Sequence, residues 1–200
     1  TLKNIKKRNE IIIVTIDDPE DKRLVSDFAF YPPIQQIDEM NWDSFEGKLY
    51  VGWEYVILRK EFSCTYPKPD NSIPNILISM GGADEVNMTE FVVESLLFLD
   101  ESFEVTIIIG PGYQYEDQLL LRLESVHYKY KIHQNPENIT NVMSQADLAV
   151  ISFGVTAYEI AALNIPAVYL CLTPDHAESA NCLVNIGAGV ESKADQQSIA

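Results

Sequence analysis

From residue 75 onward, short apolar segments alternate with stretches of helical periodicity, and this alternation constrains the fold more than any other feature. Strands that alternate with helices form right-handed βαβ units, which give a parallel sheet with helices on both faces. The sequence therefore predicts an α/β fold with a Rossmann-like parallel sheet. The predicted strands are residues 76–80, 105–109, 128–133, 148–151 and 167–172, and the predicted helices are residues 88–99, 115–126, 139–145, 156–163 and 175–186.

The chain before this region has a different pattern. Residues 11–16 form a β-branched run typical of a strand buried on both faces, and short strands are also predicted at 27–31 and 48–51. Three short strands with little helix between them do not complete a layered domain. We therefore expect residues 1–64 to be a remnant of an N-terminal domain. Proline-rich residues 65–74 are expected to be a linker and residues 75–200 a C-terminal domain.

The charge of the chain excludes several partners. Lys and Arg number 14 against 30 Asp and Glu, which gives a net charge of −16. Four of these bases are Lys3, Lys6, Lys7 and Arg8, so the rest of the chain has 10 bases against 30 acids. Such a surface repels nucleic acid and anionic membranes. No apolar run approaches the ~20 residues of a membrane span, and the three cysteines lack metal-ligand spacing. We expect a cytoplasmic protein without metal or cofactor.

A pair of glycines follows the strand predicted at 76–80. Gly81 and Gly82 let backbone amides approach an anion, and the next helix offers its own N–H groups, so this loop is a candidate phosphate site that includes Asp84. A tight turn that needs glycine for steric reasons explains the loop equally well. Residues 87–90 have the spacing of a capping box, which predicts the start of the helix.

A second loop with the same character follows the strand predicted at 148–151. The amides of Gly154, Val155 and Thr156 are candidates for phosphate binding, with Glu159 accepting hydrogen bonds from a ribose diol. Thr156 and Glu159 also have the spacing of a capping box, in which Glu159 bonds only the backbone. The spacing alone favours the cap.

The third loop, after residues 167–172, has the pattern of a helix start. Thr173 is the expected N-cap and Pro174 the first helical residue. Asp175 and His176 are candidates for contact with a ligand at the sheet edge, although a solvated helix start is the favoured interpretation. His176 and Glu178 are two residues apart and so lie on different helix faces, which is poor geometry for a metal.

Several nucleotide-binding and signalling motifs are missing. The Gly-x-Gly-x-x-Gly fingerprint lacks its third glycine, and the strand predicted at 105–109 ends in Gly110 instead of an acid, which disfavours NAD. There is no Walker A sequence. Asp17 and Asp18 resemble the acidic pair of a phospho-receiver domain, but Tyr50-Val51-Gly52 offers no acceptor aspartate. The pair is therefore interpreted as the end of a strand.

Taken together and in order, five segments of the chain resemble a known family. They are similar to the SpsG proteins of spore coat polysaccharide biosynthesis and to the related UDP-sugar hydrolase of pseudaminic acid synthesis. Both resemble in fold the transferase that adds N-acetylglucosamine to peptidoglycan lipid. The segments are TIDDP (15–19), GWEYVILRKEF (52–62), SMGGAD (79–84), ADLAV (146–150) and GVTAYE (154–159).

The resemblance implies a glycosyltransferase-B (GT-B) architecture in which the C-terminal domain holds most of the nucleotide. Carried over by position, the loop of Gly81, Gly82 and Asp84 would lie by the diphosphate. The segment 154–156 would lie by phosphate or ribose and Glu159 on the ribose hydroxyls. Where the hydrolase pattern has Asn-Gln, this chain has Asp175-His176.

The resemblance also indicates what this chain lacks. The hydrolase activates water with a histidine of a glycine-rich loop in the first half of the N-terminal domain, and this chain has no counterpart. We therefore assign no catalytic residue and expect the chain to bind a UDP-sugar but to turn it over poorly or not at all. Two alternatives remain: a non-catalytic nucleotide-binding or scaffolding module partnered with a sugar-activating enzyme, and a glycosyltransferase proper. A further hypothesis is that exposed apolar side chains around residues 31–42 pair two copies into a homodimer.

Overall fold

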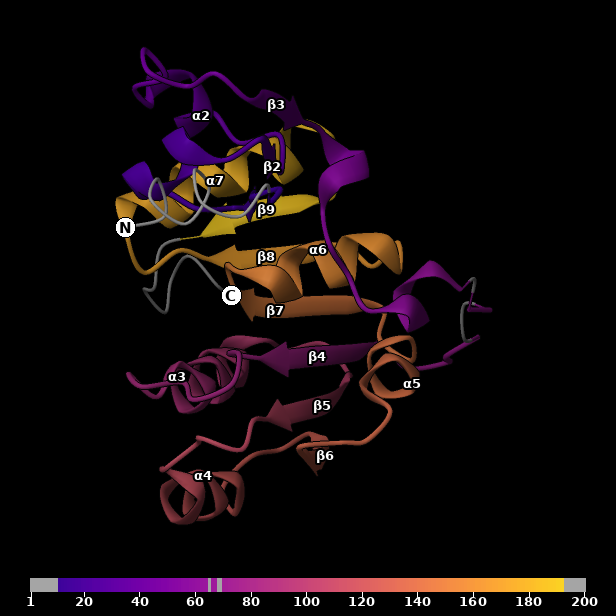
Figure 1. Cartoon of the computed structure of the whole chain (residues 1–200). Helices are drawn as coiled ribbons and strands as arrows, with labels where there is room; N and C mark the ends of the chain where they lie inside the picture. Colours follow the sequence, from indigo (N-terminus) through magenta and orange to yellow (C-terminus); the bar gives the residue numbers. More distant parts are fainter. Residues whose placement is uncertain (1–10, 65, 68–69, 193–200) are drawn as a thin grey trace. The chain divides into compact units, whose positions relative to one another are not determined.

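The structure is a computed structural model that describes residues 11–64, 66–67 and 70–192 (Figure 1). The basic residues Lys3 to Arg8 and part of the expected linker lie outside the described residues. The chain divides into two compact units between Ile57 and Leu58. This boundary precedes the one expected near residue 64, because Phe62 is buried in a hydrophobic core of the second unit. Each unit is described by itself.

The second unit contains one parallel sheet of six strands in the order β6-β5-β4-β7-β8-β9, which confirms the predicted fold class. The five predicted strands are present within a few residues of their expected bounds, and β9 was not predicted. The strands are β4 (Asn75–Ser79), β5 (Glu104–Ile109), β6 (Lys129–Gln134), β7 (Leu148–Ser152), β8 (Ala167–Leu170) and β9 (Gly189–Ser192).

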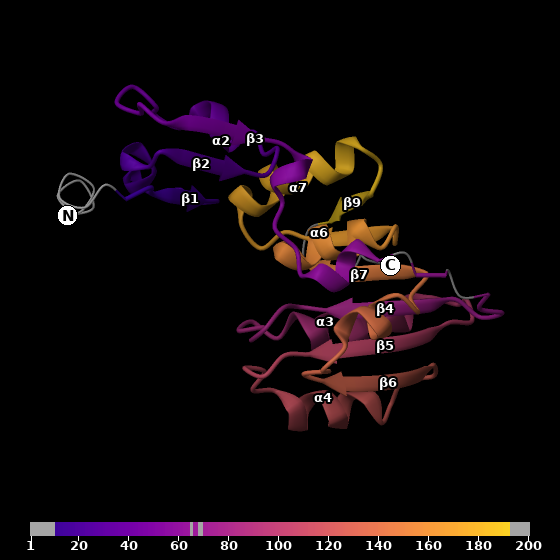
Figure 2. The same ribbon diagram turned by 45° about the vertical axis from the view of Figure 1, so that its right-hand side comes forward.

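Helices cover both faces of this sheet (Figures 1 and 2). Helices α3 and α4 lie side by side over one face, and α5, α6 and α7 cover the other. Each of these helices begins within one residue of its predicted start. The helices are α3 (Met88–Ser95), extended by the 3-10 turn η4 (Leu96–Phe98), α4 (Glu116–Leu123), α5 (Ile139–Met143), α6 (Val155–Ala162) and α7 (Pro174–Asn185), together with the 3-10 helix η3 (Lys60–Ser63).

Each face of the sheet has its own core, because successive side chains of a strand point to opposite faces. On β4, Ile76 and Ile78 belong to the core under α3 and α4, whereas Leu77 belongs to the core under α5, α6 and α7. All three are almost completely buried. A strand buried on both faces has a continuous apolar sequence, which explains why a strand could be predicted at residues 76–80.

The strand order places the candidate loops. β4, the first strand of this sheet along the chain, pairs with β5 on one side and with β7 on the other. The strand order thus changes direction at β4: β5 and β6 lie on one side of it, and β7, β8 and β9 lie on the other. In open parallel sheets, ligands bind at the carboxyl ends of the strands at such a point. The loops that follow β4 and β7 both lie there.

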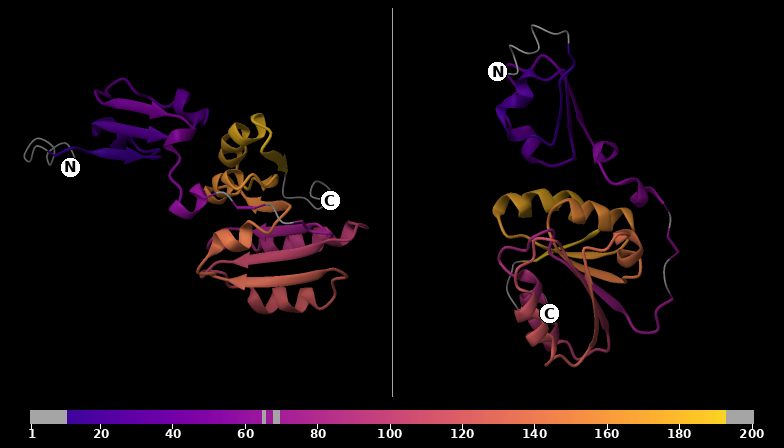
Figure 3. Two further views of the ribbon diagram at one scale, coloured as in Figure 1. Left: turned by 90° about the vertical axis from the view of Figure 1, so that its right-hand side faces the viewer. Right: turned by 60° about the horizontal axis from the view of Figure 1, so that its bottom comes forward.

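The first unit has a parallel sheet in the order β1-β2-β3 (Figure 3). Its small core consists of Ala29, Tyr31 and Ile37, with Trp42 packed against them. No helix in the described part of the chain is long and apolar enough to cross a membrane. The elements of the first unit are β1 (Val14–Ile16), η1 (Asp21–Val25), β2 (Phe28–Tyr31), α2 (Gln36–Glu39), β3 (Lys48–Val51) and η2 (Trp53–Tyr55).

Two expectations for this unit are wrong. Residues 11–16 were expected to be a strand buried on both faces, but β1 spans only Val14–Ile16, and Val14 and Ile16 are about half exposed. Thr15, between them, pairs with buried Ala29, so only alternate residues face the core. The apolar surface expected around residues 31–42 is also largely absent. Tyr31 is 1% and Ile37 4% exposed, because they form the core of this unit.

Candidate nucleotide site

The glycine loop lies beside the end of β7. Gly81 has a φ of +79°, which L side chains rarely adopt, so the turn requires glycine there. A Cβ atom on Gly81 would lie 3.9 Å from the Oγ atom of Ser152, the last residue of β7. The structure thus brings the first predicted loop next to the second. On the other side, the amide of Gly112 donates to the carbonyl oxygen of Gly82 at 2.9 Å.

The start of helix α3 differs from the expectation. The helix begins at Met88 as predicted, but the amides expected to be available to a ligand are bonded to Asp84. Its Oδ1 accepts from the Met88 amide at 2.7 Å and its Oδ2 from the Thr89 amide at 2.8 Å. The capping-box expectation is also wrong, because Asn87 donates its side-chain amide to Glu90 and caps nothing. Asp84 faces the helix, and only the Gly81–Gly82 backbone remains as a phosphate-binding candidate in this loop.

Tyr113 is a residue of this loop region that the sequence did not indicate. Its hydroxyl donates to Oδ1 of Asn87 at 2.7 Å. Burial raises the pKa of Tyr113, and the nearby carboxylates of Asp84 and Glu90 raise it further. The phenol therefore stays protonated at neutral pH and acts as a hydrogen-bond donor. An aromatic residue in the loop after β5 was the only sequence signal for it.

The start of helix α6 is open. Gly154 is its N-cap, with a φ of 164°, and a Cβ atom there would meet nothing within 4 Å. In the described part of the chain, the amides of Val155 and Thr156 donate to no acceptor. The interpretation of Thr156 and Glu159 as a capping box is wrong, because no side chain caps this helix and Glu159 bonds a different partner. An uncapped helix start offers N–H groups to an anion.

Glu159 lies one turn into α6 and is 6% exposed. Its Oε1 accepts from Nη2 of Arg59 at 2.8 Å, across 100 positions of sequence. The Arg59 guanidinium also lies 5.2 Å from the centroid of the Phe62 ring. The sequence did not indicate Arg59 as a site residue, although Arg59 lies within segment 52–62, one of the five that resemble the SpsG family. The contact between η3 and α6 brings Arg59, which precedes η3, to Glu159.

The start of helix α7 is as expected. The Thr173 Oγ1 accepts from the amide of His176 at 3.2 Å, and Pro174 is the first helical residue. Asp175 lies in the first turn. The rings of His176 and Phe153 have their centroids 6.2 Å apart, so His176 lies next to the loop that follows β7. Its Nδ1 is buried and without a hydrogen-bond partner among the described residues. These residues contain no cluster of His, Cys, Asp and Glu that could hold a metal ion.

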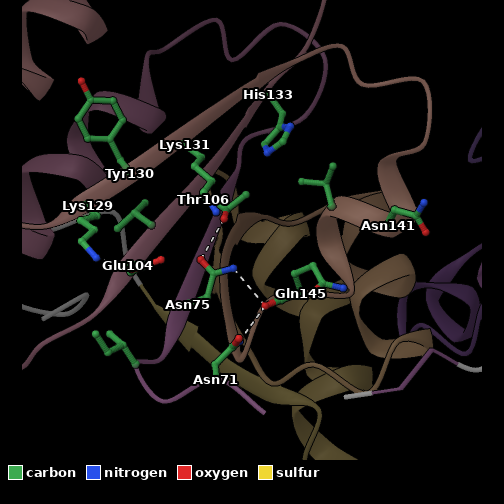
Figure 4. A pocket seen from close by; sticks show the side chains of 13 residues that line it. Asn71, Asn75, Glu104, Thr106, Lys129, Tyr130, Lys131, His133, Asn141 and Gln145 are labelled. Atoms are coloured by element: carbon green, nitrogen blue, oxygen red, sulfur yellow. Dashed lines mark hydrogen bonds and ion pairs between the residues drawn. The ribbon is translucent and has the colours of Figure 1, made fainter. Parts of the chain in front are cut away.

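A cavity of about 660 Å³ lies away from these loops (Figure 4). Most of its walls come from the amino-terminal parts of β4, β5 and β6, from the segment just before β4, and from α5 and the residues after it, so it lies toward the opposite ends of the strands. Asn71 and Asn75 both donate to the carbonyl oxygen of Gln145 there, and Thr106 donates to Asn75 (Figure 4). This network bonds the segment between α5 and β7 to the start of β4 and includes none of the predicted site residues.

The fold and the loops define a Rossmann-like α/β protein whose structural neighbours are GT-B glycosyltransferases. MurG of Acinetobacter baumannii matches with a TM-score of 0.62 and 18% identity, over 88% of this chain and 50% of that one. The calicheamicin glycosyltransferase CalG4 matches with a TM-score of 0.54 and 17% identity, over 88% of this chain and 42% of that one. At these identities the likeness concerns the fold.

Sequence comparison adds two relatives. The spore coat polysaccharide biosynthesis protein SpsG of Bacillus subtilis is 22% identical over 95% of this chain and 57% of its own length. The uncharacterized protein MJ1062 of Methanocaldococcus jannaschii is 38% identical over 60% of this chain and 26% of its own length. No family model matches the chain. The resemblance to SpsG noted from the sequence is thus confirmed as a weak homology, and this chain spans little more than half of that protein.

Proposed function

We propose that the second unit binds the nucleotide of a UDP-sugar and belongs to a glycosyltransferase or UDP-sugar hydrolase-like enzyme of surface or spore coat polysaccharide biosynthesis. The similarity to SpsG and the GT-B-like fold support a role related to glycosyl transfer. In this proposal the nucleotide binds to the second unit, and no catalytic residue is assigned. We also propose that the protein is cytoplasmic. Pairing of two copies is a separate hypothesis, which sedimentation velocity of the purified chain tests.

The observation that carries the proposal is the open start of α6 next to the glycine loop. The unbonded amides of Val155 and Thr156 would bind phosphate oxygens, because an uncapped helix N-terminus favours anions. Gly81 brings its loop close to the same strand end. Glu159, one turn further, supplies a carboxylate that would accept hydrogen bonds from the two ribose hydroxyls. An acidic protein can bind a diphosphate in this way, because surface charges are screened beyond about 8–10 Å at physiological salt.

The second candidate is a non-catalytic nucleotide-binding or scaffolding module, and one observation favours its scaffolding form. The Asp84 carboxylate occupies the start of α3, so one of the two expected anion sites already holds a negative charge. A third candidate, a glycosyltransferase that adds the sugar to an acceptor, uses the same nucleotide site. Nucleotide binding separates a scaffolding module that binds no nucleotide from the other candidates.

Isothermal titration with UDP, UMP and CMP tests the proposal. We expect UDP to bind more tightly than UMP, because the second phosphate adds charge-assisted hydrogen bonds to amides. Glu159→Gln should weaken UDP binding by about 1–3 kcal/mol, the range for a hydrogen bond to a charged group. Glu124→Gln, an exposed acid at the end of α4, is the matched control and should leave the affinity unchanged. No heat with any of the three nucleotides would exclude the proposed function and leave the scaffolding module.

A further inference from the structure

We propose that Arg59 is a positioning residue for nucleotide binding: it holds the Glu159 carboxylate in one orientation, with Oε2 left to accept from the ribose. This inference rests on the proposed function. The two residues are joined by one hydrogen bond, from Nη2 of Arg59 to Oε1 of Glu159, at 2.8 Å. In the described part of the chain, Oε2 accepts no hydrogen bond.

Arg59 has two carboxylates within reach, and the buried one is the closer. Its Nη1 lies 3.6 Å from Oε1 of Glu61, whose side chain is 39% exposed. The Glu159 side chain is only 8% exposed. The Arg59 side chain is 51% exposed, so water reaches both pairs, but the 2.8 Å contact with the buried Glu159 is the shorter and the less screened of the two. Glu159 is therefore the main electrostatic partner of Arg59.

The local structure holds Arg59 against α6. Phe62, three residues later, is 4% exposed and belongs to the core that α6 and α7 share with the sheet. The Arg59 guanidinium lies over this ring, at 5.2 Å from its centroid. Arg59 precedes η3, which packs on α6. Arg59 is thus fixed by a buried neighbour as well as by its ion pair.

The geometry of the carboxylate explains why this matters for a ligand. A carboxylate has two oxygens that accept hydrogen bonds, and a hydrogen bond to a charged group is stronger than one between neutral groups. The Arg59 guanidinium bonds Oε1 and so holds the group in one rotamer, which leaves Oε2 to accept from a ribose hydroxyl. Removing Arg59 should therefore weaken recognition of the ribose without touching the phosphate site.

The test compares UDP with its 2′,3′-dideoxy analogue, which lacks the ribose hydroxyls, by isothermal titration. The ratio of the two affinities isolates ribose recognition, because both ligands carry the same diphosphate. We expect the wild-type chain to prefer UDP at least about tenfold, which corresponds to a single charged hydrogen bond. Arg59→Gln should lose most of this preference, because the carboxylate is then no longer held in place. Arg59→Lys should keep part of it, because it retains a charged donor to Oε1.

A ligand-independent measurement completes the test: the carboxyl signal of Glu159 in carbon-13 NMR of labelled glutamate. This signal should move in Arg59→Gln and stay close to its wild-type position in Glu61→Gln, the control that removes only the exposed partner of Arg59. A preference for UDP and a Glu159 carboxyl signal that are both unchanged in Arg59→Gln would overturn the inference. Tighter binding by this variant would also overturn it, because Arg59 would then compete with the ribose. If the wild-type chain binds no UDP, the proposed function itself fails, whereas the carboxyl signal still reports on the pair.

Discussion

Gly110, which follows β5, lies so close to Gly82 that no side chain fits between them. A Cβ atom on Gly110 would stand 2.3 Å from the carbonyl oxygen and 2.6 Å from the Cα atom of Gly82. The same Gly82 carbonyl accepts the Gly112 amide at 2.9 Å. The loops after β4 and β5 are therefore packed backbone against backbone. This contact determines the position of the glycine loop at the candidate site.

The first prediction concerns this contact. Gly110→Ala should lower the free energy of unfolding by about 1–3 kcal/mol, because the new methyl group meets backbone that has to move. Since the displaced backbone is the glycine loop, UDP binding should weaken as well. Urea unfolding and titration with UDP measure the two effects. The control for the unfolding measurement alone is Gly82→Ala, whose Cβ atom would meet nothing within 4 Å. Equal stability of the two variants would contradict the close approach.

The second prediction concerns the cap of helix α3. Asp84→Ala removes the acceptors of the Met88 and Thr89 amides and should cost about 1–2 kcal/mol of unfolding free energy. Asp84→Asn keeps one acceptor oxygen and should cost less. Glu85→Ala is the matched control, since Glu85 is exposed and, among the described residues, bonds through its backbone oxygen, which accepts from Tyr115. Thermal unfolding followed by circular dichroism ranks the three variants. A Glu85→Ala variant less stable than Asp84→Ala would refute the cap.

The third prediction concerns alkaline pH. Burial raises the pKa of Tyr169 from 10.0 to about 12, with a smaller effect from Cys182. The unfolded chain therefore releases this proton at lower pH than the folded chain. The resulting stabilisation is complete below pH 10 and is lost as the pH rises toward 12. Urea unfolding at pH 8, 10 and 11 should show this loss. The pH dependence should be weaker in Tyr169→Phe than in Tyr130→Phe, in which the replaced ring is 39% exposed in the wild type.

The sequence was most informative where structure depends on neighbours along the chain. The apolar runs of β4, β5 and β7 are continuous because helices cover both faces of the sheet, and such runs stand out in any sequence. The start of α7 was equally clear, since Thr173 and Pro174 act on residues within three positions of themselves. Residues 87–90 do not form the predicted capping box, but their pattern predicted the start of α3 correctly.

The candidate site was less predictable, because its contacts join distant parts of the chain. The spacing of Thr156 and Glu159 indicated a cap, but Arg59, 100 residues away, bonds Glu159. Asp84 was expected beside a diphosphate, but its bonds to the helix that follows were not expected from the sequence. The spacing of residues identifies which groups are near in sequence. It does not identify which of several donors a carboxylate meets after the sheet has formed.

The sequence alone thus determined the alternation of strands and helices, and with it the parallel sheet and the edge at which the loops gather. These properties follow from hydrophobic periodicity, which is local and repeats over many residues. Only the tertiary structure decided which helix starts have their backbone amides bonded. The first amides of α3 donate to Asp84, whereas those of α6 are left without a capping side chain, and Glu159 pairs with Arg59. Hydrogen bonds act over about 3 Å, so their partners are selected by the packing of whole elements.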